Sequence, residues 1–84
     1  AAGFARSELG VLLEPGREAE LALLRLAVLH GGNKTSIARD AYLSRQAVYH
    51  RLGQLEGVLG VSLSDPASLA SLHAALALLD LGAV

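Results

Sequence analysis

Residues 31–59 read GGNKTSIARDAYLSRQAVYHRLGQLEGVL, and this stretch decides the fold. Its apolar residues Val48, Leu52, Leu55 and Leu59 are separated by four, three and four positions. That spacing places them on one side of a helix, which can then be buried against the rest of the protein. The opposite side of the same helix is polar or lacks side chains. The pattern therefore predicts a helix over about 45–59 with one buried and one solvent-facing side.

A second, shorter helix is predicted immediately before it. Asn33 and Ser44 are residue types that cap helix N-termini, and a helix that starts at Asn33 would end near Ala41. Only two residues then separate the helices, so the connection is a tight turn. A short helix, a tight turn and a longer helix with an exposed N-terminal half form a helix-turn-helix, whose core we place at about 33–59.

The rest of the chain is also predicted to be helical, because Leu and Ala dominate and β-branched residues are few. We expect one all-α domain over residues 1–84 with about five helices. Their expected positions are Phe4 to Leu13, Arg17 to His30, Asn33 to Ala41, Ser44 to about Leu59, and a last helix with Asp65 as N-cap and Pro66 in its first turn.

Composition argues against several classes of function. The chain has no cysteine and 4% aromatic residues, which leaves no thiolate metal site and little material for an aromatic-lined pocket. The three histidines are far apart in sequence, and no GxSxG motif occurs, so we expect no metal, no cofactor and no enzymatic activity. No apolar run approaches the ~20 residues that span a bilayer. We expect a cytoplasmic location and, since no Met occurs, a fragment of a longer chain.

The segment GGNKTS, residues 31–36, raises the alternative of a nucleotide-binding enzyme. A phosphate-binding loop has the form GxxxxGK[ST] and follows a buried strand. Here Asn33 separates Gly32 from Lys34, and the preceding residues are predicted to be helical. The spacing and the context both disfavour a phosphate loop. We interpret the glycines as the end of one helix and Asn33 as the start of the next, with an amide-rich helix start that can receive one DNA phosphate.

The charges are unevenly distributed along a chain whose net charge is −1. Residues 33–52 hold four of the seven Lys and Arg residues but only one of the eight acids, Asp40. A basic segment on an acidic protein suits an anionic partner that binds at one place. An ordinary solvated helix face explains the charge pattern equally well.

The motifs HGGN, IAR, LSRQAVYHRL, LE, LG and LSDP follow one another from residue 30 to residue 66. In this order, and followed by the leucine-rich LHAALALL, they resemble the C-terminal helix-turn-helix domain of bacterial transcriptional regulators of the PucR and CdaR type. The resemblance covers about residues 9–81. It departs from the family pattern at Gln46, Ala47 and Tyr49, where Asn, Thr and a basic residue are usual, and at Gly53 and Gln54, where charged residues are usual.

The resemblance implies an output domain that binds duplex DNA at the C-terminal end of a longer regulator. Helix 45–59 would be the recognition helix in the major groove. Arg45 is our first candidate for a base contact, since its guanidinium can pair with guanine O6 and N7. The expected base contacts are Arg45, Gln46, Tyr49 and His50. The expected phosphate contacts are Asn33, Lys34, Thr35, Arg39, Ser44 and Arg51. Arg51 has the alternative of pairing with Glu56 or Asp40.

The last helix is apolar almost all round, which predicts burial on two sides. We therefore expect a dimer or interdomain surface at Leu69, Leu72, Leu76 and Leu79. A homodimer or higher oligomer would fit a two-fold DNA site. The competing hypothesis is a helical protein-interaction module that uses this last helix and does not bind DNA.

Overall fold

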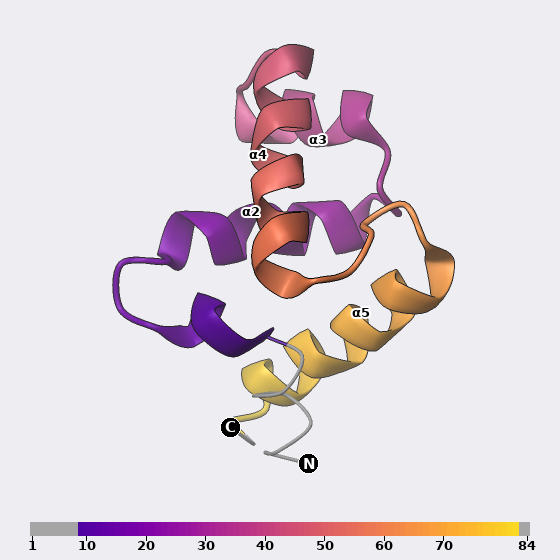
Figure 1. The fold of residues 1–84 in the computed structure, drawn as a ribbon. Coiled ribbons are helices and arrows are strands. Elements are labelled where there is room, and N and C mark those ends of the chain that lie inside the picture. The colour runs from indigo at the N-terminus through magenta and orange to yellow at the C-terminus, as the bar shows by residue number, and fades with distance from the viewer. Residues whose placement is uncertain (1–8, 83–84) are drawn as a thin grey trace.

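The structure, a computed structural model, describes residues 9–82 and contains no strand within them (Figure 1). The all-α prediction is confirmed. The elements in chain order are the 3-10 helix η1 (Gly10–Leu13) and the α-helices α2 (Glu18–Leu29), α3 (Lys34–Ala41), α4 (Arg45–Leu59) and α5 (Pro66–Asp80).

The first predicted helix, Phe4 to Leu13, needs correction. Its residues before Leu9 lie outside the described part of the chain, and Gly10–Leu13 form a 3-10 helix in place of an α-helix. Gly10 has φ +47°, a left-handed conformation that an α-helix does not contain. Propensity alone overestimated this helix because it does not take account of such a backbone bend.

Helices α3, α4 and α5 begin where the capping residues predicted. Asn33 Oδ1 accepts a hydrogen bond from the Ser36 amide at 3.1 Å, and Ser44 Oγ accepts one from the Ala47 amide at 3.1 Å. Asp65 likewise accepts from the Ser68 amide at 3.3 Å, with proline in the first turn of α5. Each cap satisfies an amide that the helix itself leaves unpaired. These local signals are strong enough to be read from the sequence.

Helix α2 is the central element of the fold. It packs against η1, α3, α4 and α5. In Figure 1, α4 crosses in front of α2, while α3 and α5 lie on different sides of it. The N-terminal end of α4 and the turn that follows α3 form one end of the molecule (Figure 1).

The core is aliphatic and draws on every element. Side chains on all five helices and one in the loop before α5 are buried, and no polar side chain is buried among residues 9–82. The buried set is Leu9, Leu12, Leu23, Leu24, Ala27, Ile37, Ala38, Val48, Leu52, Leu55, Leu63, Leu72, Ala75 and Leu76. Leu59 is partly buried against the same cluster. The stripe predicted for α4 is therefore confirmed.

The predicted dimer surface on α5 is wrong for two of its four leucines. Leu72 is 1% exposed and Leu76 is 4% exposed, because both pack into the core of this one chain. Leu69 and Leu79 are partly buried against the same core. The leucines share one side of α5, while the opposite side is made mostly of exposed alanines. Alanine makes a helix apolar in composition without requiring that its second side be covered.

An ion pair joins the second half of α2 to the last residue of α5. Both guanidinium nitrogens of Arg25 donate to the Asp80 carboxylate, at 2.9 and 2.7 Å. The hydrogen bond from Arg25 holds the pKa of Asp80 below its ordinary value. Exposed pairs of this kind stabilise folded proteins only weakly. The buried leucines, more than this pair, hold α5 on α2.

Gly32, between α2 and α3, lies close to the loop before α5. Its φ is +82°, and its amide donates to the Ala27 carbonyl at 2.9 Å, which ends α2. A Cβ atom at this position would lie 3.0 Å from the Leu63 carbonyl oxygen. Gly31 also has a positive φ, +59°, but a Cβ there would meet nothing within 4 Å. Among the glycines of residues 9–82, only Gly32 is required both by backbone conformation and by space.

Gly32→Ala should therefore lower the free energy of unfolding by about 2 kcal/mol or more, since it adds a close contact to the left-handed strain. Gly31→Ala is the matched control and should cost about 1 kcal/mol, from strain alone. Urea unfolding followed by circular dichroism measures both. Equal losses for the two variants would mean that the close approach to Leu63 does not constrain the fold.

Candidate nucleic-acid interface

The helix-turn-helix unit consists of α3, the turn Tyr42 to Ser44, and α4. Ile37 and Val48 are fully buried where the two helices meet. Ala38 is 8% exposed, and its carbonyl accepts the Leu43 amide at 3.0 Å, which closes the turn. This packing fixes the direction of α4 relative to α3. The side of α4 that carries Val48, Leu52 and Leu55 is therefore buried in the core.

The outward side of α4 carries most of the expected base contacts. Gln46, His50, Gly53 and Gly57 are all exposed, as predicted from their position opposite the buried stripe. Arg45 is exposed in the first turn of the helix. The placement of these residues is confirmed, while contact with bases remains a prediction.

Tyr49 and Lys34 contact each other across the helix-turn-helix. The Lys34 ammonium lies 5.2 Å from the centre of the Tyr49 ring, within the range of a cation–π interaction. Tyr49 is 52% exposed. The structure thus joins an expected phosphate contact to an expected base contact. The ammonium at the start of α3 and the ring on α4 are held as one unit, which favours a role for Tyr49 at the edge of the interface.

Four of the six expected phosphate contacts surround the start of α3 or the start of α4. Asn33 and Ser44 use one side-chain oxygen each as helix caps, and Thr35 is exposed directly after Lys34 in the first turn of α3. The first amides of both helices have no partner within the helix, so they favour an anion. These two helix starts give the unit two positions that suit phosphate oxygens.

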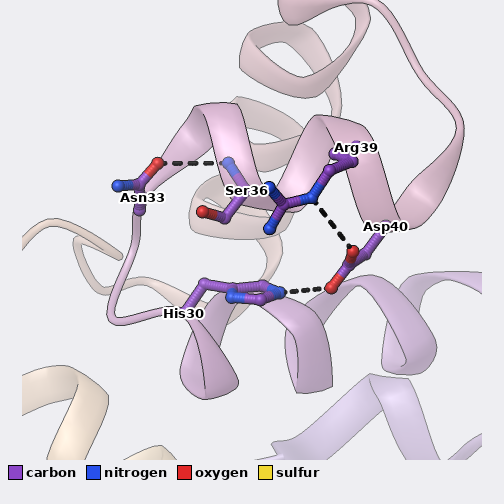
Figure 2. A network of polar contacts seen from close by, with 5 residues as sticks. All are labelled: His30, Asn33, Ser36, Arg39 and Asp40. Carbon is purple, nitrogen blue, oxygen red and sulfur yellow. Dashed lines mark hydrogen bonds and ion pairs between the residues drawn. The ribbon is translucent and has the colours of Figure 1, made fainter.

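Arg39 belongs to a polar network that the sequence did not reveal (Figure 2). His30 Nε2 donates to Asp40 Oδ2 at 2.6 Å, and Arg39 Nε lies 3.6 Å from Asp40 Oδ1. The Arg39 side chain is nevertheless 73% exposed. The network ties the end of α2 to the end of α3, so it helps to position the helix-turn-helix unit on the central helix. Its sequence signal is weak, because His30 and Asp40 are ten residues apart.

The network predicts how stability depends on pH. The hydrogen bond from His30, with a smaller charge effect of Arg39, lowers the pKa of Asp40. A carboxyl whose pKa is lower when folded stabilises the fold above its unfolded pKa, and that contribution is lost as the pH falls through the folded value. The midpoint temperature of thermal unfolding should therefore decrease as the pH is lowered below about 4. The fall should be smaller in Asp40→Asn, as measured by circular dichroism. An identical acid profile for the two proteins would contradict this role.

Arg51 is exposed on the flank of α4 that faces the start of α2. There it lines an open cleft of about 640 Å³ together with Arg17, Glu20 and His50. Among residues 9–82 neither acid considered as its partner pairs with it. Glu56 accepts the Leu63 amide at 2.7 Å, and Asp40 is bonded to His30. The alternative of an internal ion pair for Arg51 is thus not supported by the described part of the chain.

The GGNKTS segment is a helix junction. The residues before it are α2, both glycines have positive φ, and Asn33 caps α3. The successive amides that would wrap a nucleotide phosphate chain are absent from this arrangement, because the chain reverses directly from one helix into the next. The structural interpretation of the segment is confirmed.

Gly53 and Gly57 are placed where no part of the fold requires glycine. Both lie inside α4 without positive φ, and a Cβ at either position would meet nothing within 4 Å. Glycine inside an exposed helix is less stable than alanine. Beyond the first two turns, the exposed side of α4 therefore has no side chain at two positions, and Gln54 lies between them.

Gly53→Ala and Gly57→Ala should each raise the free energy of unfolding by about 0.5–1 kcal/mol, because alanine restricts the unfolded chain and favours the helix. Urea unfolding of the two single variants provides the measurement. A loss of stability in either would show that the folded chain does need a glycine there.

Two broader features bear on function. Within residues 9–82 no three His, Asp or Glu side chains are grouped so as to hold a metal ion. In the same part of the chain no helix combines the length and the apolar composition needed to cross a membrane.

Comparison with known families identifies the family to which the chain is similar. The profile of the PucR C-terminal helix-turn-helix domain matches residues 21–78, a region that runs from α2 almost to the end of α5. The match confirms the resemblance inferred from the motifs. No curated protein and no solved structure matches the chain.

Proposed function

Because the chain belongs to the PucR C-terminal helix-turn-helix domain family, we propose that it binds duplex DNA sequence-specifically as the output domain of a bacterial transcriptional regulator. The observation that carries the proposal is the arrangement of α4. One side of this helix is buried, while Arg45, Gln46, Tyr49 and His50 are exposed along its first two turns. A helix presented in this way fits the major groove, which is about 12 Å wide.

Base recognition is assigned to the N-terminal half of α4. Arg45 pairs with O6 and N7 of a guanine, and Gln46 pairs with N6 and N7 of an adenine. His50 lies on the same side one turn further on. The missing side chains at Gly53 and Gly57 leave few groups for reading bases in the second half of the helix, and they permit a close approach of the helix backbone to the groove.

Phosphate contacts on the two sides of the groove fix the position of α4. Lys34 and Thr35 meet one strand at the start of α3, where the helix dipole also favours an anion. Asn33, Arg39 and Ser44 extend this contact, and Arg51 reaches towards the other strand from the opposite flank of α4. Lys34 also contacts Tyr49 of α4 by a cation–π interaction. A phosphate bound at Lys34 would therefore help to set how deeply α4 enters the groove.

Two copies would bind the two halves of a palindromic site, since helix-turn-helix domains commonly act in pairs. The buried leucines of α5 cannot provide the contact between them. We assign pairing to other parts of a longer protein or to the exposed alanine side of α5. A cytoplasmic location follows from the proposed role in transcription.

The proposal predicts different effects for two cations. Arg45→Ala should weaken binding to a preferred site by about 1–3 kcal/mol and relax selectivity at one base pair. Lys34→Ala should lower the affinity for all duplexes alike and reduce the slope of log affinity against log salt concentration by about 1. Fluorescence anisotropy of labelled duplexes at several salt concentrations measures both effects.

The control is Arg25→Ala, which removes a cation on the far side of α2, in the pair with Asp80. It should leave the salt dependence unchanged. Equal small losses from Arg45→Ala and Lys34→Ala on every duplex would contradict base reading. Absence of binding by the folded wild-type chain at low salt would contradict DNA binding itself.

A protein-interaction module is the second candidate. Leu29, which is 71% exposed, lines a cleft of about 320 Å³ between α2 and α5, where Arg25 and Asp80 meet, and Leu81, directly after Asp80, is 81% exposed. Exposed apolar side chains around a cleft are typical of protein contacts. This candidate predicts self-association or partner binding that survives removal of the cations of α3 and α4.

A further inference from the structure

Tyr42 occupies a backbone conformation that tyrosine disfavours. It has φ +56° and ψ 42°, and it is the one non-glycine residue with positive φ among residues 9–82. Its amide donates to the Arg39 carbonyl at 3.4 Å, and the next amide, of Leu43, donates to the Ala38 carbonyl at 3.0 Å. These bonds end α3 in a left-handed cap, a position at which glycine is strongly preferred. Backbone geometry therefore does not explain a tyrosine here.

Packing does not explain it either. The Tyr42 side chain is 94% exposed, the highest value among the large apolar and aromatic residues in the described range. Within that range its hydroxyl makes no hydrogen bond and its ring meets no cation. A strained residue with no internal contacts lowers stability, and such residues persist where function requires them.

The position of Tyr42 indicates what it contacts. The residue lies in the turn two positions before the Ser44 cap, at the end of the molecule where α4 begins (Figure 1). Arg39 and Arg45 lie three residues to either side, both exposed, while Asp40 is bonded to His30. When the start of a helix enters the major groove, the residues just before it come to the rim of the groove, where phosphates and sugars lie.

We propose that Tyr42 is a DNA contact in addition to those on α3 and α4. Its hydroxyl donates to a backbone phosphate oxygen, and its ring packs against the neighbouring deoxyribose at the rim of the groove that α4 enters. The inference rests on the proposed function, because it requires the start of α4 to face DNA. The two cap bonds hold the residue in one backbone conformation, so the phenol also helps to set the register of α4 along the duplex.

Tyr42→Gly separates this role from a structural one, because the two properties should change in opposite directions. Glycine relieves the left-handed strain, so the thermal midpoint should stay equal or rise by up to about 5 °C. Affinity for a labelled mixed-sequence duplex at low salt should fall about three- to tenfold. Tyr42→Phe, which lacks only the hydroxyl, should leave the midpoint unchanged and lower affinity about threefold.

Leu29→Ala is the matched control, since it also shortens a largely exposed apolar side chain but does so at the end of α2. It should keep wild-type affinity. If the wild type binds DNA and Tyr42→Gly binds equally well, this inference is overturned while the proposed function stands. If the wild type fails to bind even at low salt, both fail. A lower midpoint for Tyr42→Gly, or a change in sedimentation mass in place of affinity, would also overturn the inference.

Discussion

The burial of Val48, Leu52 and Leu55 is the constraint on which the rest of the structure depends. These side chains are at most 4% exposed, and they commit one side of α4 to a core that every other element helps to form. A helix cannot rotate once such a stripe is buried, because rotation would expose the stripe to water. The remaining side is thus presented to solvent in a single orientation. The positions of Arg45, Gln46 and His50 follow from this packing.

Residues of the helix-turn-helix differ from those of the core in what they contribute to stability. Core positions hold aliphatic side chains that suit their surroundings. Several exposed positions of the helix-turn-helix hold residues that do not favour folding: Tyr42 in a left-handed turn, and Gly53 and Gly57 inside α4 with free space around them. Arg45 places a cation near the positive end of the helix dipole. Residues that lower the stability of the fold are expected to occur mainly at functional surfaces. Here they all lie at exposed positions of the α3–α4 unit.

Much of the fold was predictable because its signals are local. Asn33, Ser44 and Asp65 cap the helices that follow them, and the spacing of the leucines in α4 identifies its buried side. The same spacing argument, applied to Leu69, Leu72, Leu76 and Leu79, would have placed them on one side of α5. The alanines of the opposite side are also apolar, so the sequence of α5 did not show which of its sides is buried. The leucines predicted to form a dimer surface therefore contribute to the core of the chain.

Other features depend on the approach of distant segments and had no readable signal. The contact of His30 with Asp40 and the closeness of Gly32 to Leu63 arise only when α2, α3 and the loop before α5 are packed together. Tyr42 is an intermediate case. The turn between α3 and α4 contains no glycine, although a cap of this kind needs a residue with positive φ. A turn without glycine therefore indicates, from the sequence alone, that a strained residue occupies the C-cap of α3.

The most direct test of DNA binding through the start of α4 is an amide NMR titration of the chain with a mixed-sequence duplex at low salt. The account predicts that the largest shifts occur at Lys34, Arg45, Gln46 and Tyr49. The exposed side of α5, at Ala70, Ala74 and Ala77, should change little. Shifts concentrated on α5, or no shifts from a folded sample, would contradict the account and favour a surface for binding proteins.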